Sequence, residues 1–300
     1  MSGFTDDDVV DQSGRTFLVT GANTGLGFET AKVLAARGAR VLLGCRSADR
    51  AAEAIDKILA GEPDADLAFV ELDQGDLASV AAAAEQVAAE PRLDVLVNNA
   101  GVMMPPYQLT EDGFESQFGV NHLGTFALTA LLLPKLAEHD EARVVVTSSL
   151  AHRGSRIHFD DIDAAGGYNA QDRYGQSKLA NLLFTYELDR RLDAGGSSTI
   201  AVACHPGIAD TDLARHLPAF IRFGVPLLRP FFNSAAAGAW PTLMAATGDV
   251  DGGTYIGPSK RGETAGPAVI VRSSSTSRNT ELARRLWDLS VELTGVDPGI

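Results

Sequence analysis

The chain has 300 residues, of which 45% are hydrophobic and 21% are charged, and its formal net charge is −14. This apolar content supports a globular core, and the acidic charge argues against a nucleic-acid partner, which would require clustered Lys and Arg. Two cysteines, Cys45 and Cys204, are too few for a disulfide framework and lack the spacing of metal ligands, so we expect a cytoplasmic protein. The acidic lead at residues 1–13 lacks the features of a signal peptide. The sequence contains no apolar run of roughly eighteen residues, so no transmembrane segment is predicted.

Short apolar, β-rich segments alternate with helical patterns from residue 16 to residue 204. Strands are predicted at residues 16–20, 40–44, 67–72, 93–97, 143–147 and 199–204. Helices are predicted between them, at about residues 26–38, 48–60, 76–90, 114–138 and 174–192. The alternation predicts an α/β fold of the Rossmann type, a doubly wound parallel sheet with helices on both faces. No linker or repeat divides the chain, so we expect one domain over residues 1–300.

The first predicted strand leads directly into a glycine-rich turn that opens the first helix. Residues 20–27 read Thr-Gly-Ala-Asn-Thr-Gly-Leu-Gly, with the glycine spacing G-x-x-x-G-x-G. Glycines let a backbone approach a pyrophosphate closely, and the helix N-terminus supplies N–H donors and a positive dipole. A glycine cluster alone fits a structural turn equally well. Its place between the first strand and the first helix favours a dinucleotide site.

The end of the second strand indicates which dinucleotide binds. An acidic residue there would hold a ribose 2′-hydroxyl, whereas an arginine accommodates a 2′-phosphate. The sequence has Cys45-Arg46-Ser47 and no carboxylate before Asp49. A solvated surface arginine is the competing interpretation of Arg46. The missing acid favours NADP(H) over NAD(H), with Arg46 as the phosphate partner.

The segments after the third and fourth strands provide further candidates at the same edge of the sheet. Asp73 stands where an adenine contact would lie, although helix capping by Asp76 is a competing role for this acidic turn. Residues 98–101 read Asn-Asn-Ala-Gly, small enough to form the floor of a crevice and also compatible with a simple turn.

Taken together, these segments resemble the short-chain dehydrogenase/reductase family along nearly the whole chain. The matching pieces are residues 20–27 and 98–101, Asn121, Ser148-Ser149, Tyr174 with Lys178, and Pro206-Gly207. Within the family, the chain is most similar to the retinol-dehydrogenase-like branch, on residues 148–152, 157–159 and 174–185. The resemblance implies an oxidoreductase that uses a nicotinamide cofactor.

The catalytic candidates follow from the proton transfer that accompanies hydride transfer. Free tyrosine, with a pKa of about 10, is a poor base at neutral pH, so Lys178, four residues on and on the same helix face, is expected to lower the pKa of Tyr174. Ser149 would hydrogen-bond the substrate oxygen. The resemblance implies that Lys178 also reaches the nicotinamide ribose and that Asn121 anchors a proton-relay water. A chance Tyr-x-x-x-Lys, a serine turn or a helix cap would explain each motif alone, but their combination favours catalysis.

The glycine turn, the strand ends and the resemblance together define a set of expected cofactor-binding residues. These are Gly21, Asn23, Thr24, Gly25, Leu26, Gly27, Arg46, Asp73, Gln74, Asn99, Ala100, Gly101, Tyr174, Lys178, Pro206, Gly207, Ile208 and Thr211. The resemblance assigns the last four of these to the nicotinamide side, with Thr211 near the carboxamide. His152, His158 and His205 lack the spacing of metal ligands, and no metal is expected.

A proline-broken apolar segment at residues 217–232 predicts a substrate lid over residues 211–234, with a membrane-surface anchor and a protein contact as alternatives. Together with residues 157–171 and Met103, Met104 and Tyr107, it would shape an apolar pocket. We therefore expect an NADP(H)-dependent oxidoreductase that interconverts a carbonyl and an alcohol on a fairly hydrophobic small molecule. A carbon–carbon double-bond reductase and a dinucleotide-binding sensor without turnover are the alternatives. The resemblance also allows a homo-oligomer formed through the helices at 114–138 and 174–192.

Overall fold

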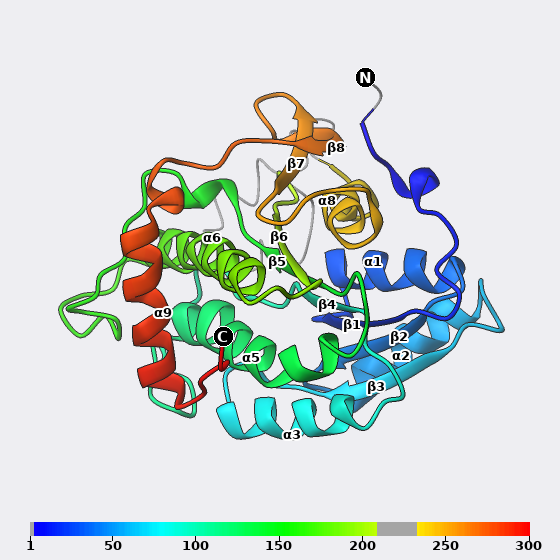
Figure 1. Cartoon of the computed structure of the whole chain (residues 1–300), viewed down its shortest axis with the longest axis horizontal. Coiled ribbons are helices and arrows are strands. Elements are labelled where there is room, and N and C mark those ends of the chain that lie inside the picture. Colours follow the sequence, from blue (N-terminus) through cyan, green and yellow to red (C-terminus); the bar gives the residue numbers. More distant parts are fainter. Residues whose placement is uncertain (1–2, 209–232) are drawn as a thin grey trace.

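The computed structural model describes residues 3–208 and 233–300, and at its centre is an eight-stranded sheet between helices (Figure 1). The strands are β1 (Thr16–Thr20), β2 (Arg40–Cys45), β3 (Leu67–Glu71), β4 (Val95–Asn98), β5 (Arg143–Thr147), β6 (Ile200–Cys204), β7 (Tyr255–Lys260) and β8 (Ala265–Ile270). Their order is β3-β2-β1-β4-β5-β6-β7-β8, and only β8 pairs antiparallel among these eight. The predicted Rossmann-type fold is confirmed. The strand order reverses direction between β1 and β4, which is where such sheets bind ligands.

Helices cover both faces of this sheet. The α-helices are α1 (Gly25–Ala36), α2 (Ala48–Leu59), α3 (Leu77–Ala88), α4 (Ser116–Phe118), α5 (Gly124–Leu136), α6 (Ala170–Ala194), α8 (Ala235–Thr247) and α9 (Thr280–Thr294). Short helical turns are η1 (Asp6–Asp8), η2 (Gly119–Leu123), η3 (Leu150–His152) and η6 (Thr276–Arg278). One face is packed by α1, α2 and α8 and the other by α3, α5 and α6, with α9 outermost against α6 (Figure 1).

Side chains of the central strands alternate between the two faces. In β1, Leu18 joins the core under α3, α5 and α6, whereas Phe17 and Val19 join the core under α1 and α8. All three are fully buried. Strands buried on both faces need continuous apolar sequence rather than alternation, as their composition predicted.

The segment predicted as mostly helical at residues 114–138 is helical from residue 116 to residue 136, and it contains a π-helical turn that the sequence did not predict. The turn, η2, joins α4 to α5 and contains Asn121. A widened turn of this kind is rare and often occurs at functional sites. The predicted helix at 174–192 begins four residues earlier, since Asn169 caps the N–H groups of Gln171 and Asp172.

The C-terminal elements β7, β8, α8 and α9 extend the fold beyond the six predicted strands. Trp287 of α9 packs on Phe126 and Phe184, with ring centroids 5.3 and 6.0 Å away, and the Arg191 guanidinium lies 4.4 Å from the Trp287 ring. Helix α9 therefore covers faces of α5 and α6. A homo-oligomer stays a prediction, and a contact through these two helices would have to accommodate α9.

The acidic lead is attached to the rest of the fold. Phe4 bridges to Ala268 of β8, and Trp240 of α8 donates from Nε1 to Asp6 Oδ1 at 2.7 Å.

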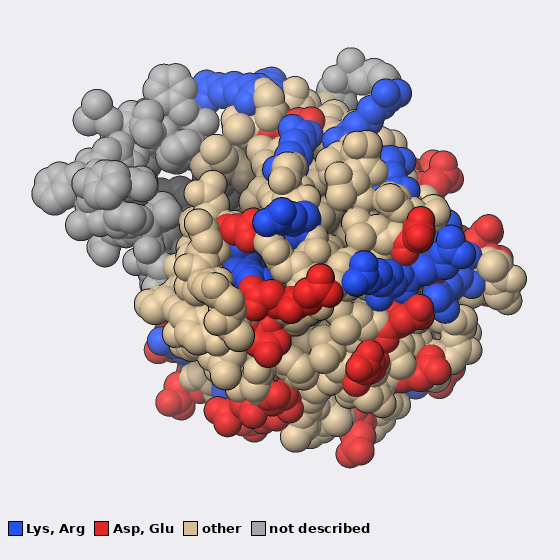
Figure 2. Space-filling model, turned by 90° about the vertical axis from the view of Figure 1, so that its left-hand side faces the viewer, with Lys and Arg blue, Asp and Glu red and all other residues tan. Residues whose placement is uncertain are grey.

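In the predicted lid at 211–234, residues 211–232 lie outside the described residues, and Ser234 caps α8. Among the helices of residues 3–208 and 233–300, none combines the length and apolar character that crossing a membrane requires. On the face shown in Figure 2, Lys and Arg are interspersed with Asp and Glu, which gather toward its lower part.

Candidate active site

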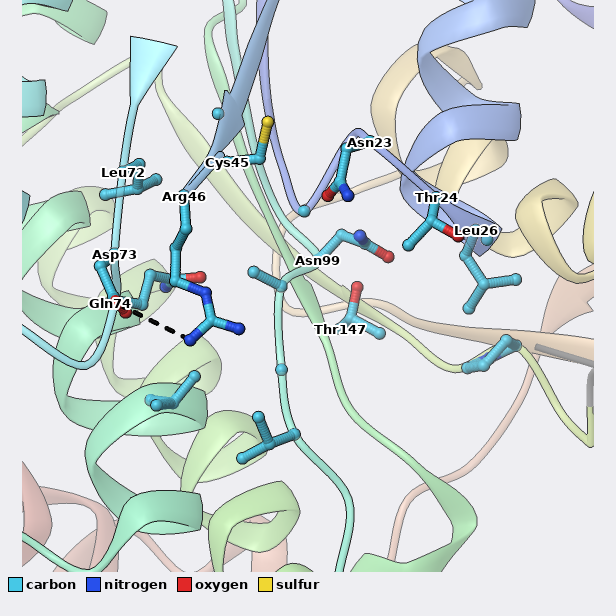
Figure 3. A pocket seen from close by; sticks show the side chains of 18 of the residues that line it. Asn23, Thr24, Leu26, Cys45, Arg46, Leu72, Asp73, Gln74, Asn99 and Thr147 are labelled. Atoms are coloured by element: carbon cyan, nitrogen blue, oxygen red, sulfur yellow. Dashed lines mark ion pairs between the residues drawn. The ribbon is translucent and has the colours of Figure 1, made fainter. Parts of the chain in front are cut away.

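A cavity of about 230 Å³ opens at the carboxyl ends of the strands, beside the β1–β4 reversal (Figure 3). Most of the predicted site residues line it: Gly21, Asn23, Thr24, Gly25, Leu26, Arg46, Asp73, Gln74, Asn99, Ala100, Gly101, Tyr174, Lys178 and Pro206. The glycine turn of β1 lies at its centre, the β2 and β3 ends at one side, and Tyr174 with Lys178 at the other. Its lining thus extends from the β3 side of the sheet to the segment after β6.

The glycine turn needs its glycines for two separate reasons. Gly21 and Gly25 adopt φ angles of +67° and +58°, which side chains with a Cβ disfavour. Gly27 permits close packing instead, since a Cβ there would lie 2.3 Å from the Gly21 carbonyl oxygen and 2.6 Å from Asn99 Nδ2. Asn99 Nδ2 in turn donates to the Thr20 carbonyl oxygen at 2.8 Å. The turn after β1 and the turn after β4 are therefore fixed to each other.

Gly27→Ala is expected to distort this turn, because the added methyl overlaps backbone atoms that have little freedom to move. We expect a loss of stability of about 1–3 kcal/mol, typical of overpacking, and at least about tenfold weaker cofactor binding. Gly61→Ala is the matched control, since its nearest neighbour would lie 3.7 Å away. Urea denaturation and NADPH titration measure both effects, and a Gly27→Ala protein that matches Gly61→Ala would contradict the packing role.

The β2 end of the cavity carries Arg46 and Asp73, which point toward each other (Figure 3). Arg46 Nη1 lies 3.7 Å from Asp73 Oδ2, and the Arg46 side chain is 70% exposed. Asp73 Oδ1 accepts the Gly75 N–H at 2.8 Å, which fixes the carboxylate. An exposed ion pair of this length is weak, so the guanidinium is free to exchange partners with an anionic ligand. Gln74 is less available, because its amide nitrogen donates to Thr125 Oγ1 at 3.1 Å.

At the other end, Tyr174 and Lys178 are both buried side chains of α6. Lys178 Nζ donates to the Thr147 carbonyl oxygen at 3.1 Å and lies 5.8 Å from the centre of the Tyr174 ring. Asn181 Nδ2 donates to the same carbonyl at 3.1 Å. The end of β5 thus holds the lysine that the sequence places beside the tyrosine.

The expected lowering of the Tyr174 pKa is wrong for this structure. Burial raises the pKa of Tyr174 to about 12, and the Ser149 hydroxyl opposes the shift only in part. Burial also lowers the pKa of Lys178 to about 8. Removal from water disfavours the charged form of each group. The Lys178 ammonium donates to the Thr147 carbonyl oxygen rather than to the phenol.

Asn121 is fully buried in the π-helical turn, and its amide is bound to the backbone after the Asn98–Gly101 turn. Its Oδ1 accepts the Val102 N–H at 2.7 Å, and its Nδ2 donates to the Val102 carbonyl at 2.9 Å and to Ser177 Oγ at 2.9 Å. A Cβ on Gly101 would lie 3.0 Å from Asn121 Oδ1 and 3.5 Å from Lys178 Nζ. Asn121 therefore lies behind the lysine, although it does not line the cavity itself.

Ser149 is the second residue after β5 and is the N-cap of η3. Its Oγ accepts the Ala151 N–H at 3.2 Å and interacts with the Tyr174 hydroxyl, whose pKa it lowers. Ser148, by contrast, turns inward and donates to the Lys178 carbonyl oxygen at 2.7 Å. The two neighbouring serines therefore differ: Ser149 is half-buried beside the tyrosine, and Ser148 ties β5 to α6.

Other predicted residues surround the cavity without lining it. Gly27, Ser149 and Gly207 each adjoin a lining residue in the sequence, and Ile208 follows Gly207. Thr211 lies outside the described residues. Sequence reasoning missed several lining residues: Gly44, Cys45, Arg50, Leu72, Val102, Val120, Thr147 and Ser148. Most of these end or directly follow a strand, so extending the strand-end rule to the last residues of β2, to the residue directly after β3 and to the end of β5 would have found them.

The three histidines considered for a metal site do not form one. Within residues 3–208 and 233–300, no group of three His, Cys, Asp or Glu side chains is arranged to hold a metal ion. His158 lies 2.7 Å from Asp172, and His152 and His205 are buried and face other partners.

A Rossmann-type sheet with a glycine turn at its reversal point, and a tyrosine–lysine pair in the same cavity, defines a nicotinamide-dependent oxidoreductase. The model of the short chain dehydrogenase family matches residues 15–221. Mouse retinol dehydrogenase 12 is 43% identical over 94% of this chain and 87% of its own length. A solved structure of a putative uncharacterized protein from Mycobacterium paratuberculosis is 40% identical, with a TM-score of 0.84 over 100% of both chains. A short chain dehydrogenase from Burkholderia cenocepacia in complex with NADP is 27% identical, with a TM-score of 0.65 over 81% of this chain and 95% of that one.

The chain belongs to the short-chain dehydrogenase/reductase family, and within it to the retinol-dehydrogenase-like proteins. It is accordingly an NAD(P)-dependent dehydrogenase that acts on alcohol or carbonyl groups.

Proposed function

We propose that the protein interconverts a carbonyl and an alcohol on a hydrophobic small molecule with NADP(H). The observation that carries this proposal is the convergence of Tyr174 and Lys178 at one end of the cavity whose other end holds Arg46. Ser149 lies outside the lining, and its hydroxyl is hydrogen-bonded to Tyr174. NADP(H), when bound, supplies or accepts the hydride. The chain must therefore provide the proton, the orientation of the substrate oxygen and the dinucleotide site.

The Tyr174 hydroxyl is the proton donor to the substrate oxygen during reduction and the acceptor during oxidation. With its pKa raised by burial to about 12, the hydroxyl is protonated at neutral pH and has a proton to donate during reduction. Ser149, beside it, donates a hydrogen bond to the same oxygen and stabilises the charge that develops there. Lys178, held by Thr147, orients toward the ribose, and Asn121 maintains the proton path behind it by fixing the Val102 backbone.

The residues at the β2 end of the cavity support the binding of the 2′-phosphate of NADP(H). Arg46 is exposed and weakly paired, and Arg50, four residues on at the start of α2, lines the same end. Two guanidinium groups and no acidic residue before Asp49 favour a phosphate over a bare ribose hydroxyl. NADP is also present in the structure of the Burkholderia cenocepacia relative.

An apolar substrate is supported by the loop that follows the lining residues Gly101 and Val102 and is joined to the segment around Tyr168. Tyr107 packs against Tyr168 with ring centroids 5.3 Å apart, and the Tyr168 hydroxyl donates to the Pro105 carbonyl oxygen at 2.7 Å. Gln117 also joins the two segments, because its Oε1 accepts the Met104 N–H at 2.8 Å and its Nε2 donates to Tyr168 Oη at 3.0 Å. These contacts fix the loop after Gly101 beside the catalytic end and leave Met103 and Met104 partly exposed.

A substrate screen that follows NADPH absorbance tests the proposal. Hydrophobic aldehydes and ketones, with retinaldehyde and nonanal among them, are expected to be reduced, and NADH is expected to support slower turnover. Retinoids belong in the screen because retinol dehydrogenases are relatives of this chain. Thermal stabilisation by NADPH without turnover of any carbonyl would instead favour a sensor. Reduction of enones at the carbon–carbon bond would favour the double-bond reductase. A cytoplasmic location stays a prediction.

Lys178→Met is expected to remove activity and yet stabilise the fold at pH 7. Burial lowers the Lys178 pKa to about 8 in the folded protein, so below that pH the charged amine destabilises the folded state. Stability then rises with pH from about 8 toward the unfolded pKa, since the unfolded chain binds more protons in that window. The Thr147 carbonyl keeps Asn181 as donor in the variant. We expect a gain of about 0.5–2 kcal/mol at pH 7 that shrinks at pH 9.5.

Urea unfolding at both pH values measures this effect. Lys57→Met is the matched control, because the Lys57 side chain is 66% exposed and should show no such pH dependence. If the unfolding midpoint of Lys178→Met differs from that of the wild type by the same amount at both pH values, the buried ammonium is not the cause of the change in stability.

A further inference from the structure

Behind Ser149 lies a buried aromatic layer that the chemistry above does not use. His152 and His205 pack on the ring of Tyr255, with ring centroids 5.7 and 5.1 Å from it, and none of the three is more than 1% exposed. His152 closes the turn that begins at Ser149, and His205 directly precedes Pro206. Tyr255 is the first residue of β7. The layer thus connects two cavity loops to the β7–β8 hairpin.

The partners of His152 determine which ring nitrogen carries its proton. His152 Nδ1 lies 2.6 Å from the Ser149 carbonyl oxygen, which can only accept, so Nδ1 must donate. His152 Nε2 lies 3.1 Å from the Ser274 N–H, which can only donate, so Nε2 must accept. The ring is therefore neutral with its proton on Nδ1. If Nε2 were protonated as well, its N–H and the Ser274 N–H would be two donors facing each other with no acceptor between them.

The partners of His205 require the opposite tautomer. The Gly207 N–H donates to His205 Nδ1 at 3.3 Å, so the proton lies on Nε2, 3.2 Å from Glu263 Oε2. Glu263 is also bound by Arg153, one residue after His152, with Nη2 2.8 Å from both carboxylate oxygens. The charged groups that face the histidine pair are therefore Glu263 and Arg153. The neutral phenol of Tyr255 is the other titratable group in contact with both rings.

The hairpin approaches the Pro206-Gly207 turn too closely for larger residues. Gly207 has a φ of +73°, and a Cβ on it would lie 2.5 Å from the Thr264 carbonyl oxygen. A Cβ on Gly257 of β7 would lie 2.0 Å from His205 Nε2. The Ile208 N–H donates to the Thr264 carbonyl at 3.0 Å. These contacts leave the loop little freedom relative to β7 and β8.

We propose that His152 is a positioning residue for Ser149, acting as a neutral Nδ1–H donor that fixes the Ser149 backbone and hence its hydroxyl. His205, with its proton on Nε2, has the corresponding role for the Pro206-Gly207 turn. The β7–β8 hairpin is then the rigid support from which both loops are held. The effect of His152 on catalysis rests on the proposed function of Ser149, whereas the two tautomers do not.

Two His152 variants separate positioning from simple packing. His152→Leu removes the donor, and we expect kcat to fall at least about tenfold with NADPH binding within about threefold of wild type. His152→Asn can place an amide N–H where Nδ1 lies, and we expect it to restore kcat to within about threefold. His139→Leu, after α5 and outside the cavity lining, is the control. NADPH and the fastest aldehyde of the screen serve as substrates, and an Asn variant as slow as the Leu variant would overturn the proposal.

A double-mutant cycle with Ser149→Ala identifies the residue through which His152 acts. In the Ser149→Ala background, His152→Leu is expected to lower kcat by less than about twofold, since the hydroxyl to be positioned is gone. A full tenfold loss in that background would overturn the role of His152 while leaving the proposed function intact. A Ser149→Ala protein with wild-type turnover would contradict the proposed function itself.

Nitrogen-15 NMR of histidine-labelled protein measures the tautomers without any substrate. At pH 7 we expect the His152 ring to be neutral with a protonated Nδ1, and the His205 ring to be neutral with a protonated Nε2. Assignment uses the single variants His152→Asn and His205→Asn. A cationic His152, or one protonated on Nε2, would overturn the proposal whatever the kinetics show.

Discussion

Tyr174→Phe is expected to lower kcat/KM by about 10²–10⁴-fold while NADPH binding stays within a few-fold of wild type. The substitution removes only the hydroxyl that exchanges a proton with the substrate oxygen, and general acid catalysis contributes a rate factor of this size. The ring and its contacts in α6 remain. The buried hydroxyl interacts with Ser149, so its loss should destabilise the fold by only about 1 kcal/mol. Steady-state kinetics with NADPH and thermal unfolding measure the two effects separately.

Tyr186→Phe provides the matched control for this experiment. Tyr186 lies on the same helix, and its hydroxyl donates to Ser273 Oγ at 2.8 Å, away from the cavity lining. It should lose a similar amount of stability and keep its activity. If Tyr174→Phe retains a nearly wild-type rate, Tyr174 is not the acid/base group, and the carbonyl mechanism proposed above is wrong.

The position of the site could be predicted from the sequence because strand ends and glycine turns leave local signals. Gly21 and Gly25 mark a turn that needs positive φ, and β1 stops where the turn begins. Strands β1 and β5 have the predicted bounds, since buried parallel strands are continuous apolar runs. Arg46 and Asp73 were found by the same reasoning, and both line the cavity.

The protonation state of the proposed catalytic pair, Tyr174 and Lys178, could not be predicted, because it depends on burial and on side-chain direction. A four-residue spacing places Tyr174 and Lys178 on one helix face, but it does not reveal that Lys178 is directed at the Thr147 carbonyl. Burial then dominates both pKa values. The π-helical turn at Asn121 was missed for a related reason: a local change of hydrogen-bond register leaves the apolar pattern of the surrounding helix nearly unchanged.

The C-terminal support of the site was missed for two different reasons. Strand β7 reads Tyr-Ile-Gly-Pro-Ser-Lys, and its glycine and proline hide it from a search for apolar runs. Helix α9 was detectable, since Ala283, Leu286, Trp287 and Ser290 recur at helical spacing and are all buried. What no local pattern contains is the contact of the β7–β8 hairpin with the turn at Gly207, which joins residues about fifty positions apart along the chain.

Arg46→Asp is expected to weaken NADPH binding by about 10²-fold or more and to change NADH binding by less than about threefold. The substitution replaces a charge-assisted donor with a carboxylate that repels the 2′-phosphate, whereas the same carboxylate can accept a bond from the ribose 2′-hydroxyl of NADH. Arg46 is 70% exposed and only weakly paired with Asp73, so its loss should leave the fold intact. Titration of each cofactor at fixed ionic strength measures the ratio of the two dissociation constants.

Lys57→Asp on α2, the helix that begins two residues after Arg46, controls for the change in net charge. Its side chain is exposed and pairs with Glu53, and it does not line the cavity. A uniform electrostatic effect would weaken NADPH equally in both variants and would fade with added salt, because exposed charges beyond a Debye length of roughly 10 Å are screened at about 0.1 M. Loss of a direct contact with the 2′-phosphate would weaken NADPH binding in the Arg46→Asp variant alone. If Arg46→Asp weakens NADPH and NADH equally, the arginine does not read the 2′-phosphate, and the preference for NADP(H) loses its structural basis.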